Sequence, residues 1–384
     1  MSSGLEVRAV SGREELERFV RLPFELAARH AADQRPNAVP PLLGDERDLH
    51  DPEKNPALAD SKVEHWLAWR DGGPVGRVMG IIHHPWNERS GDQGARFFQL
   101  ACVKDAEVVK ALLQAVEAWA SAQGMVRIYG PFGFSDRDPQ GLQVEGLEHM
   151  PVVSTPTNPD WLPPMVEALG YAPMEEMVSY RLEVTPGMAA RFAPVAERCL
   201  AASRLRRMRL VSKPALRNWV VPVLRLVNLT YEDIFGFVPM KKKEMQALAE
   251  KYMFILDPEL VELLVDEHNE PVAFVIAAPD MSEGLIKANG RLLPFGWAHI
   301  LRYMRRAKQL DLLLGAVRPD LQGKGLTAVL ALNLLTTAEK RGFTHLDSHL
   351  VMARNTRMCA QMERLGGKVW KRYRVFAKPL SGLS

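Results

Sequence analysis

The stretch LLLGAVRPDLQGKGLTAVL, residues 312–330, contains the most informative pattern in this chain. Its first six residues are apolar or small and are bounded by charged residues, which is typical of a buried β-strand. Gly323 and Gly325 follow in a short polar turn, and apolar residues then recur at helical spacing from Leu326 onward. The pattern therefore predicts a strand, a glycine-rich turn and the N-terminus of a helix.

This arrangement is suited to binding a pyrophosphate. Glycines let the backbone approach phosphate oxygens, and the first N–H groups of a helix point outward at the positive end of its dipole. Lys324 adds a full positive charge. The spacing excludes a P-loop, because no Gly-Lys-Ser/Thr closes the turn, and it excludes the dinucleotide fingerprint G-x-G-x-x-G. An ordinary turn before a structural helix is the alternative interpretation.

The turn resembles the acyl-CoA loop of the GNAT superfamily, which reads Q/R-x-x-G-x-G/A after a strand that ends in Val-x-Pro. Gln322, Gly325 and Thr327 occupy the defined positions, and Val317 and Pro319 precede them. Thr327 departs from the Gly or Ala of the superfamily. This departure concerns the tightness of the turn, whereas the anion-binding arrangement of the loop is kept.

A second signature of the superfamily begins with Asn and reads N-x-x-A-x-x-x-Y-x-x-x-G-F. Asn355 and Gly366 match this signature, whereas Met358, Met362 and Gly367 replace its Ala, Tyr and Phe. The second signature is therefore met in part, and it lies where the superfamily places it, after the loop and its helix.

The resemblance extends over residues 257–380 and implies that acetyl-CoA or another acyl-CoA is a co-substrate. It implies acyl-CoA-dependent N-acyltransfer, expected to be N-acetyltransfer, to an amine of a small molecule or peptide of unknown identity. The oligomeric state is left open. The implied cofactor-binding residues are Gly315, Ala316, Val317, Gln322, Gly323, Lys324, Gly325, Leu326, Thr327 and Asn355.

Transfer from a thioester to an amine requires a neutral amine, a polarised carbonyl and a proton for the thiolate. Many GNAT members place a Glu base eleven residues before the Gln or Arg of the loop, and Asp311 occupies that position here. Asp311 is the first candidate base, with a solvated strand-end charge as the alternative. His345, Asp347 and His349 alternate along one strand and share a face. We interpret them as a polar face, expect no metal site, and keep His349 as the second candidate base.

Matching segments indicate an internal duplication. Val75 and Val272 each follow a proline at the start of a predicted strand, and they are 197 residues apart. Leu169 and Leu365 precede the last strand of each half and are 196 residues apart. The two offsets nearly agree and the order of elements is the same twice. The sequence therefore predicts an α/β (α+β) fold of two tandem GNAT-like domains, each a mixed twisted sheet flanked by helices.

The expected domains are residues 1–186 and 187–384. The first is expected to be degenerate, because no glycine loop follows its corresponding strand and Asp105 and Glu107 would repel a phosphate. A long insertion at residues 130–160 is rich in turn residues and aromatics. Shaping an acceptor pocket and covering a sheet edge are equally good explanations for this insertion.

Bulk composition is that of a globular protein, with 47% hydrophobic and 25% charged residues and a net charge of +3. The sequence shows no apolar run of membrane-spanning length and no N-terminal signal peptide, so we expect a cytoplasmic protein without membrane or nucleic-acid partners. Basic clusters at residues 204–209, 241–243 and 302–308 are interpreted as solvated faces, with phosphates or acidic partners as the alternative.

Two other functions are compatible with the pattern. A non-catalytic CoA-binding or regulatory protein is favoured by Met362, which stands where the superfamily usually has a tyrosine acid and has no proton to give. An aminoacyl-tRNA-dependent transferase ranks lower, because such paired GNAT enzymes typically lack a functional pyrophosphate loop. Turnover of acetyl-CoA would distinguish the enzyme from the binding protein.

Overall fold

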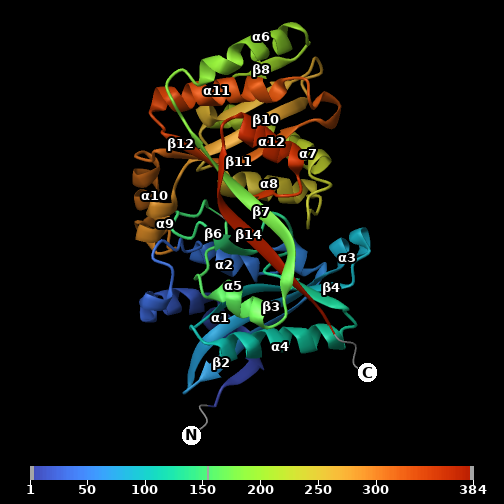
Figure 1. Cartoon of the computed structure of the whole chain (residues 1–384), viewed down its shortest axis with the longest axis vertical. Coiled ribbons are helices and arrows are strands. Elements are labelled where there is room, and N and C mark those ends of the chain that lie inside the picture. The colour runs from blue at the N-terminus through green and yellow to red at the C-terminus, as the bar shows by residue number, and fades with distance from the viewer. Residues whose placement is uncertain (1–3, 154, 381–384) are drawn as a thin grey trace.

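In the computed structural model, which describes residues 4–153 and 155–380, strands from both halves of the chain form one continuous mixed sheet (Figure 1). The strand order is β1-β2-β3-β4-β5-β14-β7-β12-β11-β10-β9-β8, with β6 paired to β14 and β13 paired to β7. Only the pairs β4–β5 and β11–β12 are parallel among the described strands. The sheet is therefore mixed, as the sequence predicted.

Each half contributes helices and strands in a similar order. The N-terminal half contains β1 (Glu6–Ala9), α1 (Gly12–Arg29), α2 (Leu43–Leu49), β2 (Ser61–Arg70), β3 (Gly73–His83), α3 (His84–Ser90), β4 (Gly94–Cys102), α4 (Ala106–Ala122), β5 (Arg127–Gly130), β6 (Leu142–Glu145), α5 (Leu162–Ala168) and β7 (Ala172–Glu183). The C-terminal half contains α6 (Ala193–Ala201), β8 (Arg206–Met208), α7 (Lys213–Thr230), α8 (Lys242–Tyr252), β9 (Val261–Val265), β10 (Pro271–Pro279), α9 (Ser282–Ala288), α10 (Gly296–Met304), β11 (Gln309–Val317), α11 (Leu326–Arg341), β12 (His345–Ser348), β13 (Val351–Met352), α12 (Thr356–Arg364) and β14 (Lys368–Pro379). Short 3-10 turns cover Ala31–Asp33, Pro56–Leu58, Ala189–Phe192, Pro258–Leu260 and Pro319–Leu321.

The sheet has the symmetry expected of a duplication. From one edge the order is β1, β2, β3, β4, β5 and β14, and from the other edge it is β8, β9, β10, β11, β12 and β7. Val75 on β3 and Val272 on β10 consequently occupy equivalent positions. The last strands β7 and β14 are both 12 residues long. The duplication predicted from the sequence offsets is confirmed.

The last strand of each half lies in the half-sheet of the other. β7 pairs with β12, β14 pairs with β5, and β7 and β14 pair with each other from Lys368↔Arg181 to Ala377↔Ala172. Figure 1 shows these two long strands, green and red, crossing together through the middle of the molecule. The predicted boundary at residue 186 falls just after β7. The division into two domains there remains a prediction.

Helices cover both faces of each half-sheet. In the N-terminal half, α4 packs on the face that carries Val78 and α1 on the face that carries Met79, because successive strand residues point to opposite faces. Gly76 in β3 permits the close approach of α4, since a Cβ there would lie 2.8 Å from Leu112 Cδ1. In the C-terminal half, α11 and α7 take the corresponding faces, next to Ala273 and Phe274 respectively.

We predict that the fragments 1–186 and 187–384 do not fold independently. Without β14 the first fragment leaves one edge of β5 without a partner, and without β7 the second leaves one edge of β12 without a partner; free strand edges of this kind promote aggregation. Size-exclusion chromatography and urea unfolding are expected to show aggregated or non-cooperative fragments alone and a 1:1 complex when they are refolded together. A monomeric fragment 1–186 that unfolds cooperatively would contradict this interpretation.

Candidate active site

The centre of the candidate site is the point at which β11 and β12 separate. The two strands pair in parallel from Gln309↔His345 to Leu312↔Ser348, and the backbone N–H of His349 makes the last link to the carbonyl of Leu312 at 3.0 Å. Beyond Leu312 strand β11 continues to Val317 alongside β10 only, with the extra residue of a bulge at Leu313. Peptide groups at the end of β11 therefore face an open slot.

The glycine-rich turn after β11 has the predicted geometry. Gly323 and Gly325 have φ values of 79° and 89°, in the left-handed region that favours glycine, and α11 begins at Leu326. Gln322 holds the turn against the strand, because its Nε2 donates to the carbonyl of Val317 at 3.2 Å and its Oε1 accepts from Arg357. The first N–H groups of α11 have no intrahelical acceptors and are available to an anion.

Most of the predicted site residues meet at one cavity. Gly315, Ala316, Val317, Gln322, Thr327, Asn355 and His349 all line it. Asn355 also caps α12, since its side chain accepts from the N–H of Met358 at 3.1 Å. Gly323 and Lys324 are exposed on the turn, and Leu326 is buried beneath it. The cofactor-binding role of all these residues remains a prediction.

The cavity itself is large and extends through both halves of the molecule. Its volume is about 2240 Å³, and apolar side chains dominate its wall. It runs from the slot beside β11 past α7 and α8 to β4 and the region between α1 and α2. Two stretches of the 130–160 insertion, residues 134–142 and 155–159, lie on its wall, and β6 of the insertion pairs with β14. The insertion thus both shapes the cavity and extends the sheet.

His349 is the candidate base that reaches this cavity. The side chain is partly buried, and burial together with the Lys371 ammonium lowers its pKa to about 4. The imidazole is therefore neutral at pH 7 and able to accept a proton. Its position directly after β12 places it at the slot where the two strands separate.

Asp311, by contrast, is enclosed. Its residue is 1% exposed, it is not part of the cavity wall, and one carboxylate oxygen accepts from Gln309 Nε2 at 2.8 Å. The other oxygen is buried without a hydrogen-bond partner among the described residues. Burial, aided by the charges of Asp280 and Asp347, raises the pKa of Asp311 well above its ordinary value. Its role as base remains a prediction from the sequence.

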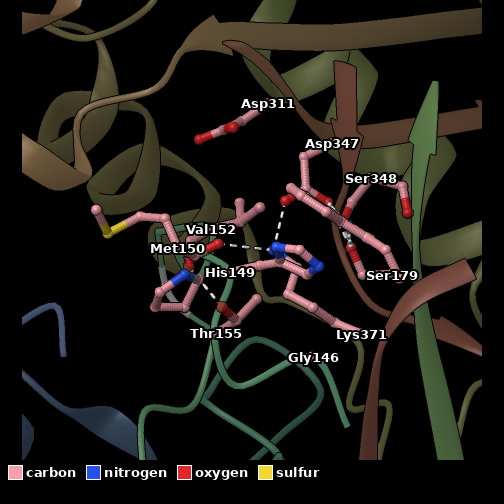
Figure 2. A network of polar contacts seen from close by, with 12 residues as sticks. Gly146, His149, Met150, Val152, Thr155, Ser179, Asp311, Asp347, Ser348 and Lys371 are labelled. Atoms are coloured by element: carbon pink, nitrogen blue, oxygen red, sulfur yellow. Dashed lines mark hydrogen bonds and ion pairs between the residues drawn. The ribbon is translucent and has the colours of Figure 1, made fainter. Parts of the chain in front are cut away.

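A buried polar network lies next to Asp311 (Figure 2). Lys371 and Asp347 are both 0% exposed and form an ion pair, and Lys371 Nζ also donates to the carbonyl of Met150 at 2.9 Å. Asp347 further accepts from Ser179 Oγ and from Trp370 Nε1. The network joins β7, β12 and β14 to the insertion of the N-terminal half. The charge of Lys371 acts on the pKa of His345, Asp347 and His349, and Asp347 forms the ion pair with it.

One polar residue of the cavity was missed by the sequence analysis. The side chain of Asp136, in the insertion, is 9% exposed, and its Oδ1 is buried without a hydrogen-bond partner in the described chain. Burial raises the pKa of Asp136 to about 6, so the carboxylate is ionised at pH 7. Tyr231 lies near its charge and donates to the carbonyl of Gly315 at 3.1 Å. In the sequence, the signal for this residue was its place in the long insertion at residues 130–160.

The corresponding helix start in the N-terminal half is occupied by its own side chains. Asp105 caps α4 by accepting from the N–H of Glu107 at 2.8 Å, and its other oxygen accepts from Arg70 at 2.7 Å. At the start of α4, the Asp105 carboxylate therefore occupies the position that corresponds to the free N–H groups of α11. The loss of the phosphate site in the first half remains a prediction.

Within residues 4–153 and 155–380, no group of three or more His, Cys, Asp or Glu side chains is arranged to hold a metal ion. Over the same described residues, none of the helices has both the length and the apolar character needed to cross a bilayer.

Solved structures identify the fold. A tandem GNAT protein from the clavulanic acid biosynthesis pathway superposes with a TM-score of 0.54 at 13% identity, covering 98% of this chain and 99% of that one. A GCN5-related N-acetyltransferase from Sphaerobacter thermophilus gives a TM-score of 0.50 at 13% identity, covering 98% and 96%. The chain therefore has the GNAT fold in its tandem form, as the two sequence signatures implied.

Sequence relatives cover the whole chain. No protein-family model matches it. Protein YghO from Escherichia coli is 26% identical over 383 residues, which cover 97% of this chain and 95% of the relative. A bacterial ceramide synthase from Caulobacter vibrioides is 28% identical over 386 residues, which cover 99% of this chain and 98% of the relative.

Proposed function

We propose that this protein is an acyl-CoA-dependent N-acyltransferase that joins a long-chain acyl group to a long-chain amine. The observation that carries the proposal is the apolar cavity of about 2240 Å³ that adjoins the slot beside β11. Ligand pockets usually measure roughly 300–1,000 Å³. An acetyl group and a small amine would leave most of this space empty, whereas two alkyl chains would use it.

The similarity to a ceramide synthase supports this substrate class. A ceramide is the amide of a fatty acid with a long-chain amino alcohol, so its synthesis brings two alkyl chains to one centre. The relative matches nearly end to end at 28% identity. The sequence analysis expected acetyl transfer, and the size of the cavity is the reason for proposing a longer acyl group.

The proposed chemistry is direct transfer. The pyrophosphate of the acyl-CoA lies on the N–H groups of the turn and of α11, and the thioester lies in the slot beside Gly315, Ala316 and Val317, whose peptide groups face it. The amine nitrogen attacks the carbonyl carbon, the C–S bond breaks, and CoA leaves as a thiolate that takes a proton from water. His349 accepts the proton that the nitrogen loses as the amide forms.

Asp136 supplies the polar end of the acceptor site. Its buried Oδ1 lies 3.9 Å from the Arg137 guanidinium but accepts no hydrogen bond from the described chain, so it is suited to accept one from the amine or from a neighbouring hydroxyl group. Because Asp136 belongs to the insertion, the N-terminal half contributes to the acceptor site although its own phosphate site is lost.

We expect catalytic efficiency to rise with acyl length. Each buried CH₂ group contributes about 0.8 kcal/mol, so kcat/KM with sphinganine should increase by roughly 10²-fold or more from acetyl-CoA to palmitoyl-CoA. Amide formation is measured by mass spectrometry and thiol release by a colorimetric assay. Equal or faster reaction with acetyl-CoA and a short amine would exclude the long-chain proposal, and absence of turnover would favour the CoA-binding alternative.

In the same assay, Asp136→Asn should raise KM for the amine and leave KM for acyl-CoA unchanged.

CoA is predicted to bind once per chain. Gly325→Glu places a side chain at a φ of 89° and a carboxylate among the phosphate's donors, so calorimetry should show binding weakened at least roughly tenfold. Gly342→Glu is the matched control, because Gly342 has a φ of 73° at the opposite end of α11. This control separates the loss of the anion site from backbone strain. A stoichiometry of two, or unchanged binding in the Gly325 variant, would refute the assignment.

His349→Gln tests the base. Glutamine keeps hydrogen-bonding capacity but does not titrate, so kcat/KM should fall by roughly 10²-fold at neutral pH while acyl-CoA affinity is kept. In the parent protein the base form of His349 is present above its pKa of about 4 and is lost as the pH falls through that value. Asp311→Asn serves as the comparison. If Asp311→Asn alone reduces the rate and His349→Gln does not, the base predicted from the sequence is correct.

A further inference from the structure

The helices α9 and α10 form a hairpin at one edge of the molecule (Figure 1). They pack closely, because a Cβ on Gly284 would lie 2.6 Å from the Cα of Ile300. The carbonyl of Gly290, in the connecting loop, accepts from the N–H of Leu43 at 2.8 Å, which ties the hairpin to the N-terminal half. The two helices therefore pack against each other, and the hairpin is attached to the N-terminal half.

The tip of this hairpin exposes three large apolar side chains. Leu293, Phe295 and Trp297 are 78%, 70% and 51% exposed, and they fall within five consecutive residues. The indole N–H of Trp297 donates to the carbonyl of Pro294 at 3.1 Å, which leaves the ring free to enter an apolar environment. Clustered exposure of this kind is unfavourable in water and marks an interaction site.

The hairpin that carries this tip is positively charged along its sequence. Residues 282–308 contain six Lys or Arg residues and a single acidic residue, Glu283. All six are exposed and form no ion pair with the described part of the chain: Lys287, Arg291, Arg302, Arg305, Arg306 and Lys308. Aromatic residues surrounded by cations are typical of surfaces that bind anionic lipids.

The same hairpin forms part of the cavity wall. Leu285, Asn289 and Leu292 line the cavity wall, facing residues 39–42 of the N-terminal half, which line it too. Leu292, on the cavity wall, is followed directly by the exposed Leu293. An alkyl chain taken up at the tip would therefore pass from one apolar surface to the next.

We propose that the α9–α10 hairpin docks on the surface of an anionic lipid bilayer. Leu293, Phe295 and Trp297 enter the headgroup region, and the surrounding lysines and arginines contact lipid phosphates. Docking in this orientation places this part of the cavity wall beside the membrane that holds long-chain amines, a consequence that rests on the proposed function. A second copy of the chain is a poorer occupant, because a symmetric contact here would bring like charges together. The proposal replaces the sequence-based expectation of no membrane partner.

Vesicle flotation tests the docking directly. The full-length protein is expected to float with vesicles of phosphatidylglycerol and phosphatidylcholine, to bind pure phosphatidylcholine weakly, and to dissociate as salt screens the charges. The triple variant Leu293→Ser, Phe295→Ser and Trp297→Ser should lose roughly tenfold or more in vesicle partition. The matched control is Val211→Ser with Leu229→Ser, since these residues are also exposed, at 83% and 51%, but lie elsewhere. This control should bind like the parent.

Activity on dispersed substrate separates the two proposals. With detergent-solubilised sphinganine, the triple variant should retain the turnover of the parent, because none of its three substituted side chains lines the cavity. Failure of the parent to float, or equal flotation of parent and triple variant, would overturn the docking proposal whatever the activity. Conversion of a parent dimer to a monomer by the triple variant, without vesicle binding, would identify a second copy as the occupant and also overturn it.

Discussion

The pairing of β7 with β14 is the contact on which the rest of the molecule depends. It runs along most of both strands and joins two half-sheets that otherwise share no strand pairing among the described residues. Because each of the two strands completes the half-sheet formed by the other part of the chain, neither half-sheet is complete by itself. The cavity is enclosed by both halves, so its shape is fixed by this pairing.

The buried ion pair between Lys371 and Asp347 lies at the same junction. Removing two charges from water is costly, and their attraction compensates for that cost only when the geometry is good and the remaining polar groups are bonded. Here Met150, Ser179 and Trp370 provide the additional hydrogen bonds. We interpret the network as specifying register, because a shift of β14 by one residue would turn Lys371 to the opposite face of the sheet.

Local features of the fold and site could be predicted from the sequence because each depends on neighbouring residues. The strand, turn and helix at residues 312–330 follow from apolar spacing and two glycines, and the offset of 196 revealed the repeat. The exchange of β7 and β14 could not be predicted, since an exchanged and an unexchanged last strand have the same pattern. The lowered pKa of His349 likewise depends on its burial and on the charge of Lys371, and both arise only in the folded sheet. The same holds for Asp136, whose loop sequence suggests solvent although the fold encloses it.

The strand exchange also orders events during synthesis. β5 emerges from the ribosome early, but its neighbour β14 (Lys368–Pro379) is translated after all the other described strands. The first half-sheet must therefore wait with an open edge while some 240 residues that separate the two strands are translated. A nascent chain with such an edge is prone to misassembly and is a natural substrate for chaperones. Synthesis of β14, rather than completion of the first half, thus sets the earliest moment at which the first half-sheet can become native.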